Sequence, residues 1–355
     1  MVTNNKILQE KFIIGILTIG RKNSSLTGNI TLFRDLSVEL AKKGGKVVVL
    51  TPDCFHENVI KGGFVFNQRK KSWMVINYEG VPAVIYNRIP YRKDEKTEEF
   101  EGVIGWCNKN NVPMFNRSFF KKWDIYNALS KEPKLIKHLP FTQLIQSKEQ
   151  LEQQLNTFHS LYLKPNDGSK GNGIFVLSRK EDQTIHIKGH NGIYGSSFFQ
   201  NIWEKKVNPL LLEKEYILQK KTDIAKYQER SFDYRVLSHN VKNSWVVSGI
   251  GIRQSKHNGI TTHVLKGGSI LTVAEVSTSN DIEKVANLTY LCGNALEKAF
   301  GIGCIKEFSM DIGKTVDGEF YIFDVNSKPM KFDEPHIYKN GLNNLVEIFL
   351  EYVCE

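Results

Sequence analysis

The segment 307–329 restricts the fold of this 355-residue chain more than any other, because it reads as two apolar strands joined by Asp317-Gly318. An Asp-Gly pair between alternating apolar residues is a strong signal for a two-residue hairpin loop. Such a loop makes the strands antiparallel and pairs Val316 with Glu319, which fixes the partner of every other residue. The sequence therefore predicts a tight β-hairpin in this segment.

Two carboxylates face each other in that hairpin. In the predicted register Asp311 lies opposite Asp324, and Ser309 lies opposite Asn326. All four share one sheet face, because residues two apart in a strand point the same way. Facing carboxylates repel, so among strands this apolar we expect a divalent cation such as Mg²⁺, held by oxygen ligands, to lie between them. The alternatives are a solvated sheet face, or a four-residue loop that shifts the register.

A second candidate site is the segment 161–174, where a strand delivers Lys164 into a loop with Gly168, Gly171 and Gly173. Glycines permit positive φ, so successive backbone N–H groups can point at phosphate oxygens, and Lys164 adds a positive charge beside them. The order differs from a P-loop, which needs its lysine after the glycines and a helix next. A plain glycine-rich hairpin turn is the alternative interpretation of this segment.

Two arginines, Arg235 and Arg253, lie on successive apolar strands. Such a placement indicates charges that point into a site, because isolated strand arginines usually lie on a surface face. A guanidinium can grip phosphate or carboxylate with two parallel hydrogen bonds. For one of the two, the alternative is a surface ion pair such as Asp233–Arg235.

The first 118 residues alternate strand and helix signals, which is typical of a parallel α/β sheet. We expect strands at 12–17, 46–50 and 83–86, and helices at 28–43 and 96–109. Gly20 and Gly28 do not complete a G-x-G-x-x-G pattern, so no dinucleotide site is expected.

The remaining residues mix the two kinds of element and contain no internal repeat. Helix signals lie at 124–130, 148–155 and 282–300, the last with an apolar stripe. Strand signals lie at 161–164, 174–177, 216–219, 234–237, 245–252 and 308–312. The fold class is therefore α/β, with an α+β arrangement after the N-terminal part.

Composition excludes several other classes of protein. A charged fraction of 24% with 21 Phe, 13 Tyr and 5 Trp is not that of a disordered chain. No apolar run approaches the ~20 residues of a membrane helix, and the first residues lack a signal-peptide core, so we expect a cytoplasmic protein without a membrane span. Five cysteines without a C-x-x-C favour reduced thiols. The net charge of +10 comes without a nucleic-acid-binding signature, so no nucleic-acid partner is expected.

Together these motifs resemble the ATP-grasp superfamily. The matching pieces are Lys-Pro-Asn-Asp-Gly-Ser-Lys-Gly-Asn-Gly-Ile at 164–174, Asp-Tyr-Arg-Val at 233–236, Arg253, Gly267-Gly268, and acidic strands that end in Val-Asn-Ser-Lys-Pro at 325–329. Their order fits from about Lys121 to the end of the chain. Within the superfamily, the sequences at 86–92 and 324–334 are similar to the YheC/YheD branch, whose members are described as endospore-coat-associated.

The resemblance implies an ATP-grasp fold of two α+β subdomains, 119–218 and 219–355, that clamp ATP after an N-terminal parallel α/β domain at 1–118. Lys164 would contact the α- and β-phosphates, Lys122 would be a second phosphate-contacting lysine, and the backbone of a hinge at 218–221 would contact adenine. The implied ATP-binding set is Lys122, Lys164, Gly168, Ser169, Lys170, Gly171, Gly173, Gln219, Lys220 and Lys221.

The resemblance also implies that Asp311, Asp324 and Asn326 bind Mg²⁺, in agreement with the hairpin register. The implied catalytic set is Arg253, Lys164 and Arg235, with Arg253 matching the arginine that stabilises the transferred phosphoryl group. Two residues depart from the family. Asp324 stands where the family usually has Glu, so one of two magnesium ions would bind weakly, and His263 stands where many members carry Asn.

The function implied by the resemblance is an ATP-dependent ligase that joins a carboxylate to an amine through an acyl phosphate. Its partners would be small-molecule or peptide substrates, and spore coat proteins. The alternatives are a coat-associated ATP-binding protein with little turnover, and an ATP-grasp kinase that phosphorylates a hydroxyl. Magnesium, lysines and arginine are what such chemistry needs to offset phosphate charge, and no side-chain nucleophile is required.

Overall fold

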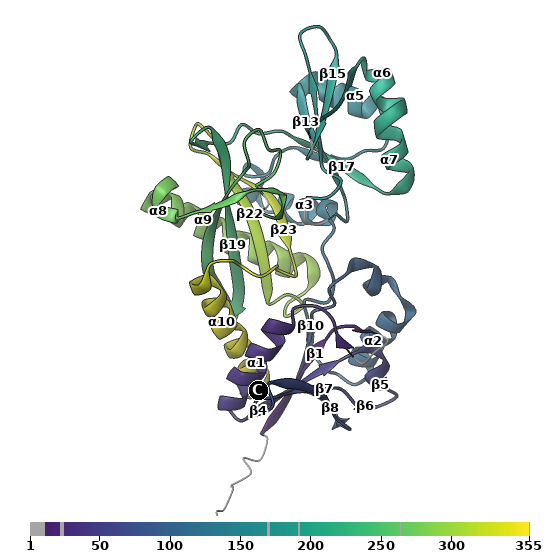
Figure 1. Cartoon of the computed structure of the whole chain (residues 1–355), viewed down its shortest axis with the longest axis vertical. Helices are drawn as coiled ribbons and strands as arrows, with labels where there is room; N and C mark the ends of the chain where they lie inside the picture. The colour runs from purple at the N-terminus through teal and green to yellow at the C-terminus, as the bar shows by residue number, and fades with distance from the viewer. Residues whose placement is uncertain (1–10, 22–24, 169–170, 191, 263, 355) are drawn as a thin grey trace, which may run out of the picture.

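Three large β-sheets follow one another along an elongated molecule in the computed structural model, which describes residues 11–21, 25–168, 171–190, 192–262 and 264–354 (Figure 1). The N-terminal sheet lies at one end and the sheet of residues 142–220 at the other. The C-terminal sheet lies between them, so the order in space differs from the order in the chain. The expected mixed α/β architecture is confirmed.

The N-terminal sheet has the strand order β11-β10-β1-β4-β7-β8, and its first four strands are parallel. These strands are β1 (Phe12–Leu17), β4 (Gly45–Leu50), β7 (Phe64–Asn67), β8 (Ser72–Val75), β10 (Val84–Asn87) and β11 (Met114–Phe115). Two small sheets join β2 (Gly20–Arg21) to β3 (Ser25–Leu26), and β5 (Phe55–His56) to β6 (Val59–Lys61) and β9 (Glu79–Gly80). The three predicted strands are confirmed, and the β7–β8 hairpin was not predicted.

The N-terminal helices are α1 (Ile30–Lys42) and α2 (Glu98–Lys109). Both are confirmed with later starts than predicted, because polar side chains cap them. The side chain of Asn29 accepts a hydrogen bond from the N–H of Leu32, and that of Thr97 accepts one from the N–H of Phe100. The predicted start at residue 96 belongs instead to a short 3-10 turn, η2 (Arg92–Lys96).

The last helix, α10 (Pro335–Cys354), was not predicted. It returns from the C-terminal sheet to the N-terminal end of the molecule and lies beside α1 (Figure 1). Leu345, Val346, Ile348 and Phe349 of α10 are part of the same apolar core as α1 and the N-terminal strands. Gly341 permits this packing on β19, since a Cβ there would lie 2.8 Å from the side chain of Leu237.

The sheet of residues 142–220 is the second of the three along the chain, and we call it the middle sheet for that reason, although it lies at one end of the molecule. It is antiparallel in the order β12-β17-β13-β14-β15-β16. Its strands are β12 (Thr142–Leu144), β13 (Ser160–Pro165), β14 (Phe175–Arg179), β15 (Ile185–Gly189), β16 (Gly192–Ser197) and β17 (Tyr216–Lys220). The helical segments beside it are α5 (Lys148–Phe158), α6 (Phe199–Ile202), the π-helical turn η3 (Trp203–Val207) and α7 (Asn208–Glu213). Its apolar core is formed by residues 141–218 alone.

The C-terminal sheet has the order β21-β20-β19-β22-β23, with β18 paired to β19. Its strands are β18 (Lys226–Tyr227), β19 (Arg230–Val241), β20 (Ser244–Gln254), β21 (Ser269–Leu271), β22 (Glu307–Lys314) and β23 (Phe320–Asn326). Besides α10, the helices that accompany it are α3 (Lys122–Ser130), α4 (Pro133–Ile136), α8 (Val273–Val276) and α9 (Ser279–Phe300). The remaining 3-10 turns are η1 (Pro52–Cys54) and η4 (Val264–Lys266). Side chains of α3, α4 and α9 form one core with this sheet.

The predicted register of the β22–β23 hairpin is correct at the site, although the predicted loop is wrong. Asp311 pairs with Asp324, as expected. The loop holds three residues instead of two, because the N–H of Thr315 donates to the carbonyl of Glu319 at 2.7 Å and Gly318 takes a φ of +83°. A β-bulge at Phe323 adds one residue to β23 and restores the expected pairing from Asp311 onward.

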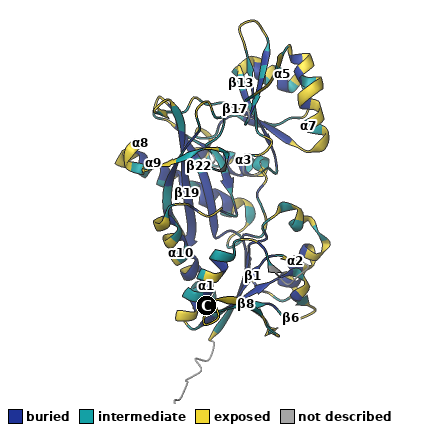
Figure 2. Ribbon diagram, viewed as in Figure 1, coloured by how far each residue is buried: buried dark blue, intermediate teal, exposed yellow. Residues whose placement is uncertain are grey.

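Buried residues concentrate on the strands of the three sheets, and exposed residues on the outer helices and loops (Figure 2). Within the described ranges, no helix combines the length and the apolar character that crossing a bilayer requires.

Candidate functional site

One face of the C-terminal sheet carries the predicted metal ligands and both predicted arginines. Arg235 on β19 lies opposite Asp311 on β22, which lies opposite Asp324 on β23. Asp233, two residues before Arg235, lies opposite Arg253 on β20. Because alternate residues of a strand share a face, the strand pairing alone brings these side chains into one layer.

This layer forms the floor of a cleft between the three sheets. The cleft encloses about 1430 Å³, its open mouth included. The middle sheet contributes Tyr162, Lys164, Gly171, Ile174, Gln219 and Lys220, and the N-terminal region contributes Pro90, Arg92 and Phe119. From the C-terminal region come Asp233, Arg235, Arg253, Thr262, Asp311, Asp324, Asn326 and Lys328.

Each of the two facing carboxylates has a cationic partner within the chain. Arg235 Nη1 lies 2.7 Å from Asp311 Oδ1, and Lys122 Nζ lies 2.7 Å from Asp324 Oδ1. Burial raises the pKa of Asp324, but Lys122 and Lys164 outweigh it and hold that pKa below its usual value. The repulsion from which a cation was expected is therefore offset by the protein itself.

The donor set nevertheless fits a magnesium ion. Asp311 and Asp324 are each about a quarter exposed towards the cleft, at 24% and 26% of the side chain. Asn326 lies on the same face, with its Nδ2 3.5 Å from Asp324 Oδ2, which leaves its carbonyl oxygen for other partners. Carboxylate and amide oxygens are ligands that Mg²⁺ prefers. Within the described ranges, three or more His, Cys, Asp or Glu side chains do not gather as a metal site, so any cation here would depend on the two aspartates and the amide.

Lys164 extends from β13 into the cleft. Its Nζ donates to Gln219 Oε1 at 2.6 Å and lies 3.4 Å from the carbonyl of Phe323, the bulged residue of β23. Burial and, after it, the nearby Lys122 lower the pKa of Lys164 to about 8. Gln219 in turn donates to the hydroxyl of Thr142. The side chain of Gln219 thus orients Lys164, which precedes the glycine loop.

The predicted hinge residues are partly committed to the middle sheet. The N–H of Lys220 donates to the carbonyl of Phe141 at 2.8 Å, and the N–H of Lys221 donates to that of Ser160 at 3.1 Å. Lys220 lines the cleft, together with Thr222 just beyond the strand. Adenine contact by this backbone stays a prediction, and in this conformation those two N–H groups are already used.

The glycine loop joins β13 to β14 at the rim of the cleft. Gly171 and Gly173 have φ values of +68° and +71°, the conformation for which glycine was expected. A Cβ on Gly173 would also lie 2.9 Å from Pro165, so close packing requires glycine there as well. Gly168 donates its N–H to the carbonyl of Pro165. Ser169 and Lys170, both predicted to bind phosphate, lie outside the described residues.

Arg235 is buried and Arg253 is half-buried, and the alternative of an Asp233–Arg235 surface pair is wrong. Arg235 pairs with Asp311, while Asp233 accepts a hydrogen bond from the hydroxyl of Thr262. Burial and, second, the charge of Asp311 raise the pKa of Asp233 to about 7. Burial and the nearby Arg235 lower the pKa of Arg253. His263 lies outside the described residues.

Lys328, to which the sequence assigned no role, lies with Arg92 in a cationic group on the N-terminal rim of the cleft. The Nζ of Lys328 and the guanidinium carbon of Arg92 lie 4.5 Å and 4.9 Å from the centre of the Phe119 ring. Lys328 also pairs with Glu95, and burial lowers its pKa to about 8. The only signal in the sequence was the position of Lys328, two residues after the predicted ligand Asn326.

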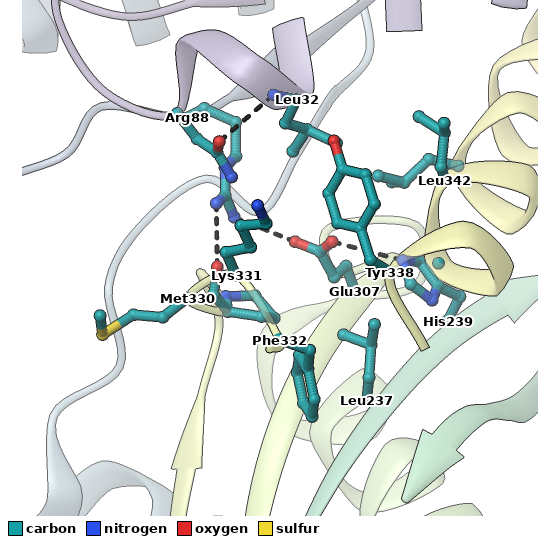
Figure 3. Close-up of a pocket in the computed structure, with 14 residues that line it drawn as sticks. Leu32, Arg88, Leu237, His239, Glu307, Met330, Lys331, Phe332, Tyr338 and Leu342 are labelled. Atoms are coloured by element: carbon teal, nitrogen blue, oxygen red, sulfur yellow. Dashed lines mark hydrogen bonds and ion pairs between the residues drawn. The ribbon is translucent and has the colours of Figure 1, made fainter. Parts of the chain in front are cut away.

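A second, smaller cavity lies beneath α10, where the N-terminal and C-terminal sheets meet (Figure 3). Arg88 Nη1 lies 3.1 Å from Glu307 Oε1, and His239 Nε2 lies 3.3 Å from Glu307 Oε2. Arg88 also donates to the carbonyl of Pro329 at 2.9 Å. This buried group joins the N-terminal sheet to β22 and to Pro329, three residues after the predicted metal ligand Asn326.

Comparisons with known proteins identify a family and two relatives. A family model described as YheC/D-like ATP-grasp matches residues 111–355. The chain is 28% identical over 314 residues to the endospore coat-associated protein YheD of Bacillus subtilis (strain 168), covering 80% of this chain and 68% of YheD. It is 25% identical over 338 residues to YheC of the same strain, covering 89% and 88%.

Among solved structures, D-alanyl-alanine synthetase A from Vibrio cholerae O1 biovar eltor str. N16961 superposes with a TM-score of 0.55 at 11% identity, covering 98% of this chain and 99% of that one. At such identity the likeness concerns the fold alone, and that fold is ATP-grasp. Together with the match over residues 111–355, it shows that this chain belongs to the YheC/D-like ATP-grasp family.

Proposed function

We propose that this protein is an ATP-dependent ligase that joins a carboxylate to an amine through an acyl-phosphate intermediate. The observation that carries the proposal is the cleft itself. Lys164, Arg253 and the oxygens of Asp311, Asp324 and Asn326 line it, Lys122 is paired with Asp324, and the loop at its rim has glycines in the positive-φ conformation. Family membership supports ATP as the nucleotide.

In this proposal Asp311, Asp324 and Asn326 would hold Mg²⁺, which supplies positive charge against the phosphates. Lys164, already oriented by Gln219, binds phosphate oxygens. Lys122 and Arg235 pair with the two carboxylates in this structure and have the charge to bind phosphate oxygens as well. Arg253 stabilises charge on the transferred phosphoryl group.

The reaction has two steps, neither of which needs a nucleophile from the protein. An oxygen of the substrate carboxylate attacks the γ-phosphorus, and the bond to the bridging oxygen breaks to release ADP. The amine nitrogen then attacks the acyl carbon, and phosphate leaves with the electron pair of the broken C–O bond. The substrates we propose are small molecules or peptides, and the cationic group of Arg92 and Lys328 at the rim favours an acidic one.

The test is ADP release from Mg-ATP across a panel of amino acids and short peptides, supplied singly and in pairs. A ligase releases ADP only when a carboxylate and an amine are both present. A phosphorylated product without any amine would indicate the kinase alternative. Asp311→Asn should abolish ADP release, because it removes a charged oxygen donor from the expected metal site, and unchanged turnover would contradict the metal assignment.

A coat-associated protein with little turnover is the second candidate. The relatives YheD and YheC, which are named endospore coat-associated proteins, favour it. Asp324 is also one methylene shorter than the usual Glu, and Lys122 is bound to it. A rise in melting temperature with Mg-ATP, without ADP release for any substrate pair, would support this candidate over the ligase.

A further inference from the structure

Asp233 differs from the other two carboxylates that line the cleft. Asp311 and Asp324 each have a cationic partner at 2.7 Å. Asp233 is only 8% exposed, and its Oδ2 accepts a hydrogen bond from Thr262. Its Oδ1 is buried and has no hydrogen-bond partner among the described residues. None of the roles proposed above for the ATP-binding and metal-binding residues gives Asp233 Oδ1 a partner.

An unpaired buried carboxylate oxygen is costly, because desolvation of the charge is not repaid by a hydrogen bond. Such atoms are rare in native proteins and call for a partner that the structure lacks, such as a bound ligand. Asp233 lines the cleft, so a ligand there can reach it. A carboxylate accepts hydrogen bonds and attracts positive charge. The ligand group that fits it is therefore a hydrogen-bond donor that carries a positive charge or can take one up.

The position of Asp233 in the sheet says which part of the reaction it faces. It lies opposite Arg253 on the neighbouring strand, and its charge interacts with those of Arg253 and Asp311. In the proposed function Arg253 contacts the phosphoryl group during its transfer. A group held by Asp233 is therefore next to the acyl carbon that carries the phosphate, where the nucleophile has to be.

We propose that Asp233 binds the amino group of the second substrate and receives its proton, with Thr262 fixing the orientation of the carboxyl group. This inference rests on the proposed ligase function. The amine, neutral after losing one proton to solvent, attacks the acyl carbon. The C–N bond forms, the C–O bond to phosphate breaks, its electron pair leaves on phosphate, and the proton on nitrogen passes to the Asp233 carboxylate.

The test separates the two half-reactions in the full-length protein. Carboxylates from the twenty amino acids and from Glu- and Asp-containing dipeptides are incubated with Mg-ATP. One arm adds hydroxylamine at high concentration, which needs no binding site of its own and traps an acyl phosphate as a hydroxamate, detected by its coloured iron(III) complex. The other arm adds ammonium chloride or glycinamide, and ADP release is measured as their concentration varies.

Asp233→Asn keeps the shape of the side chain and removes its charge. We expect it to lower amine-dependent turnover about 10²–10⁴-fold, with a higher KM for glycinamide, while hydroxamate formation stays near the wild-type rate. Thr262→Val should weaken the amine arm to a smaller extent. Asp317→Asn, at the exposed hairpin tip, is the matched control and should behave as wild type in both arms.

Two results would overturn the inference while leaving the ligase function standing. If Asp233→Asn lowers both arms equally, Asp233 acts on phosphoryl transfer, for instance by positioning Arg253. If it changes neither arm, Asp233 does not handle the amine. A wild-type protein that is silent in both arms with every carboxylate refutes the ligase function itself, and the role of Asp233 is refuted with it.

Discussion

The buried ion pair between Arg88 and Glu307 offers the sharpest test of how the N-terminal sheet is held to the site. Both side chains are at most 8% exposed. Arg88→Met would leave Glu307 with Tyr86, whose hydroxyl donates at 2.7 Å, and with His239 at 3.3 Å. It would also leave the carbonyl of Pro329 without its donor.

Removing one partner of a buried pair typically costs about 3–5 kcal/mol, because the other charge stays buried without compensation. The remaining donor from Tyr86 favours the lower end of that range. An unpaired buried carbonyl adds a desolvation cost of about 1–3 kcal/mol. We therefore expect Arg88→Met to lower the free energy of unfolding by about 4 kcal/mol.

The assay is urea unfolding followed by tryptophan fluorescence, with a shift of the midpoint at constant slope taken as the loss of stability. Lys298→Met is the matched control, since it breaks a pair with Glu132 in which Lys298 is 75% exposed. Such a pair contributes about 0–1 kcal/mol. If both variants shift the midpoint equally, the buried group is not what joins the two sheets, and the reasoning from burial is refuted.

Three further predictions concern stability. Gly293→Ala places a methyl group 2.4 Å from the Trp245 ring and should lower the free energy of unfolding by about 1–3 kcal/mol through overpacking. As its control, Gly102→Ala in α2 meets no atom within 4 Å and should be neutral or stabilising. Thermal unfolding of the two variants compares them. Gly318→Ala has open space around it but a φ of +83°, so it should cost about 1–2 kcal/mol through the backbone alone, and a smaller loss in urea unfolding would refute the three-residue loop. Because the pKa of Asp233 is raised to about 7, the folded state binds more protons than the unfolded state between about pH 4 and pH 7. The contribution of Asp233 to stability therefore falls as pH rises through that window. Asp233→Asn should melt above wild type at pH 8 and not at pH 4.

The hairpin shows how far sequence reasoning reaches. The assumption of a two-residue Asp-Gly loop placed Asp311 opposite Asp324 correctly, although the loop itself holds three residues. The same reasoning missed the three-residue loop and the bulge at Phe323, which cancel each other in the register. Nothing in an Asp-Gly pair distinguishes that combination from a plain two-residue turn.

Other features depend on contacts that the sequence does not encode locally. Lys122 meets Asp324 across 202 positions of chain, so its choice of partner follows from how α3 approaches β23. Helix α10 was missed although it contains apolar residues at helical spacing, because Gly341 and its three asparagines lower the helix propensity of that segment. Domain boundaries at 118 and 218, and the roles assigned to single residues, stay predictions.

The middle sheet has an apolar core of its own and meets the rest of the molecule largely through polar contacts. The chain enters it near Phe141 and leaves it after Lys220, and its apolar core is formed by residues 141–218. Across the cleft it is fastened by polar contacts such as Tyr162 to the carbonyl of Ile260 at 3.1 Å, Lys256 to that of His190 at 3.1 Å and Lys96 to Asp167 at 3.3 Å. Water can replace each of these bonds, so a movement of this unit relative to the C-terminal sheet would break mainly polar contacts, whereas α10 ties the N-terminal sheet to the C-terminal sheet through apolar packing.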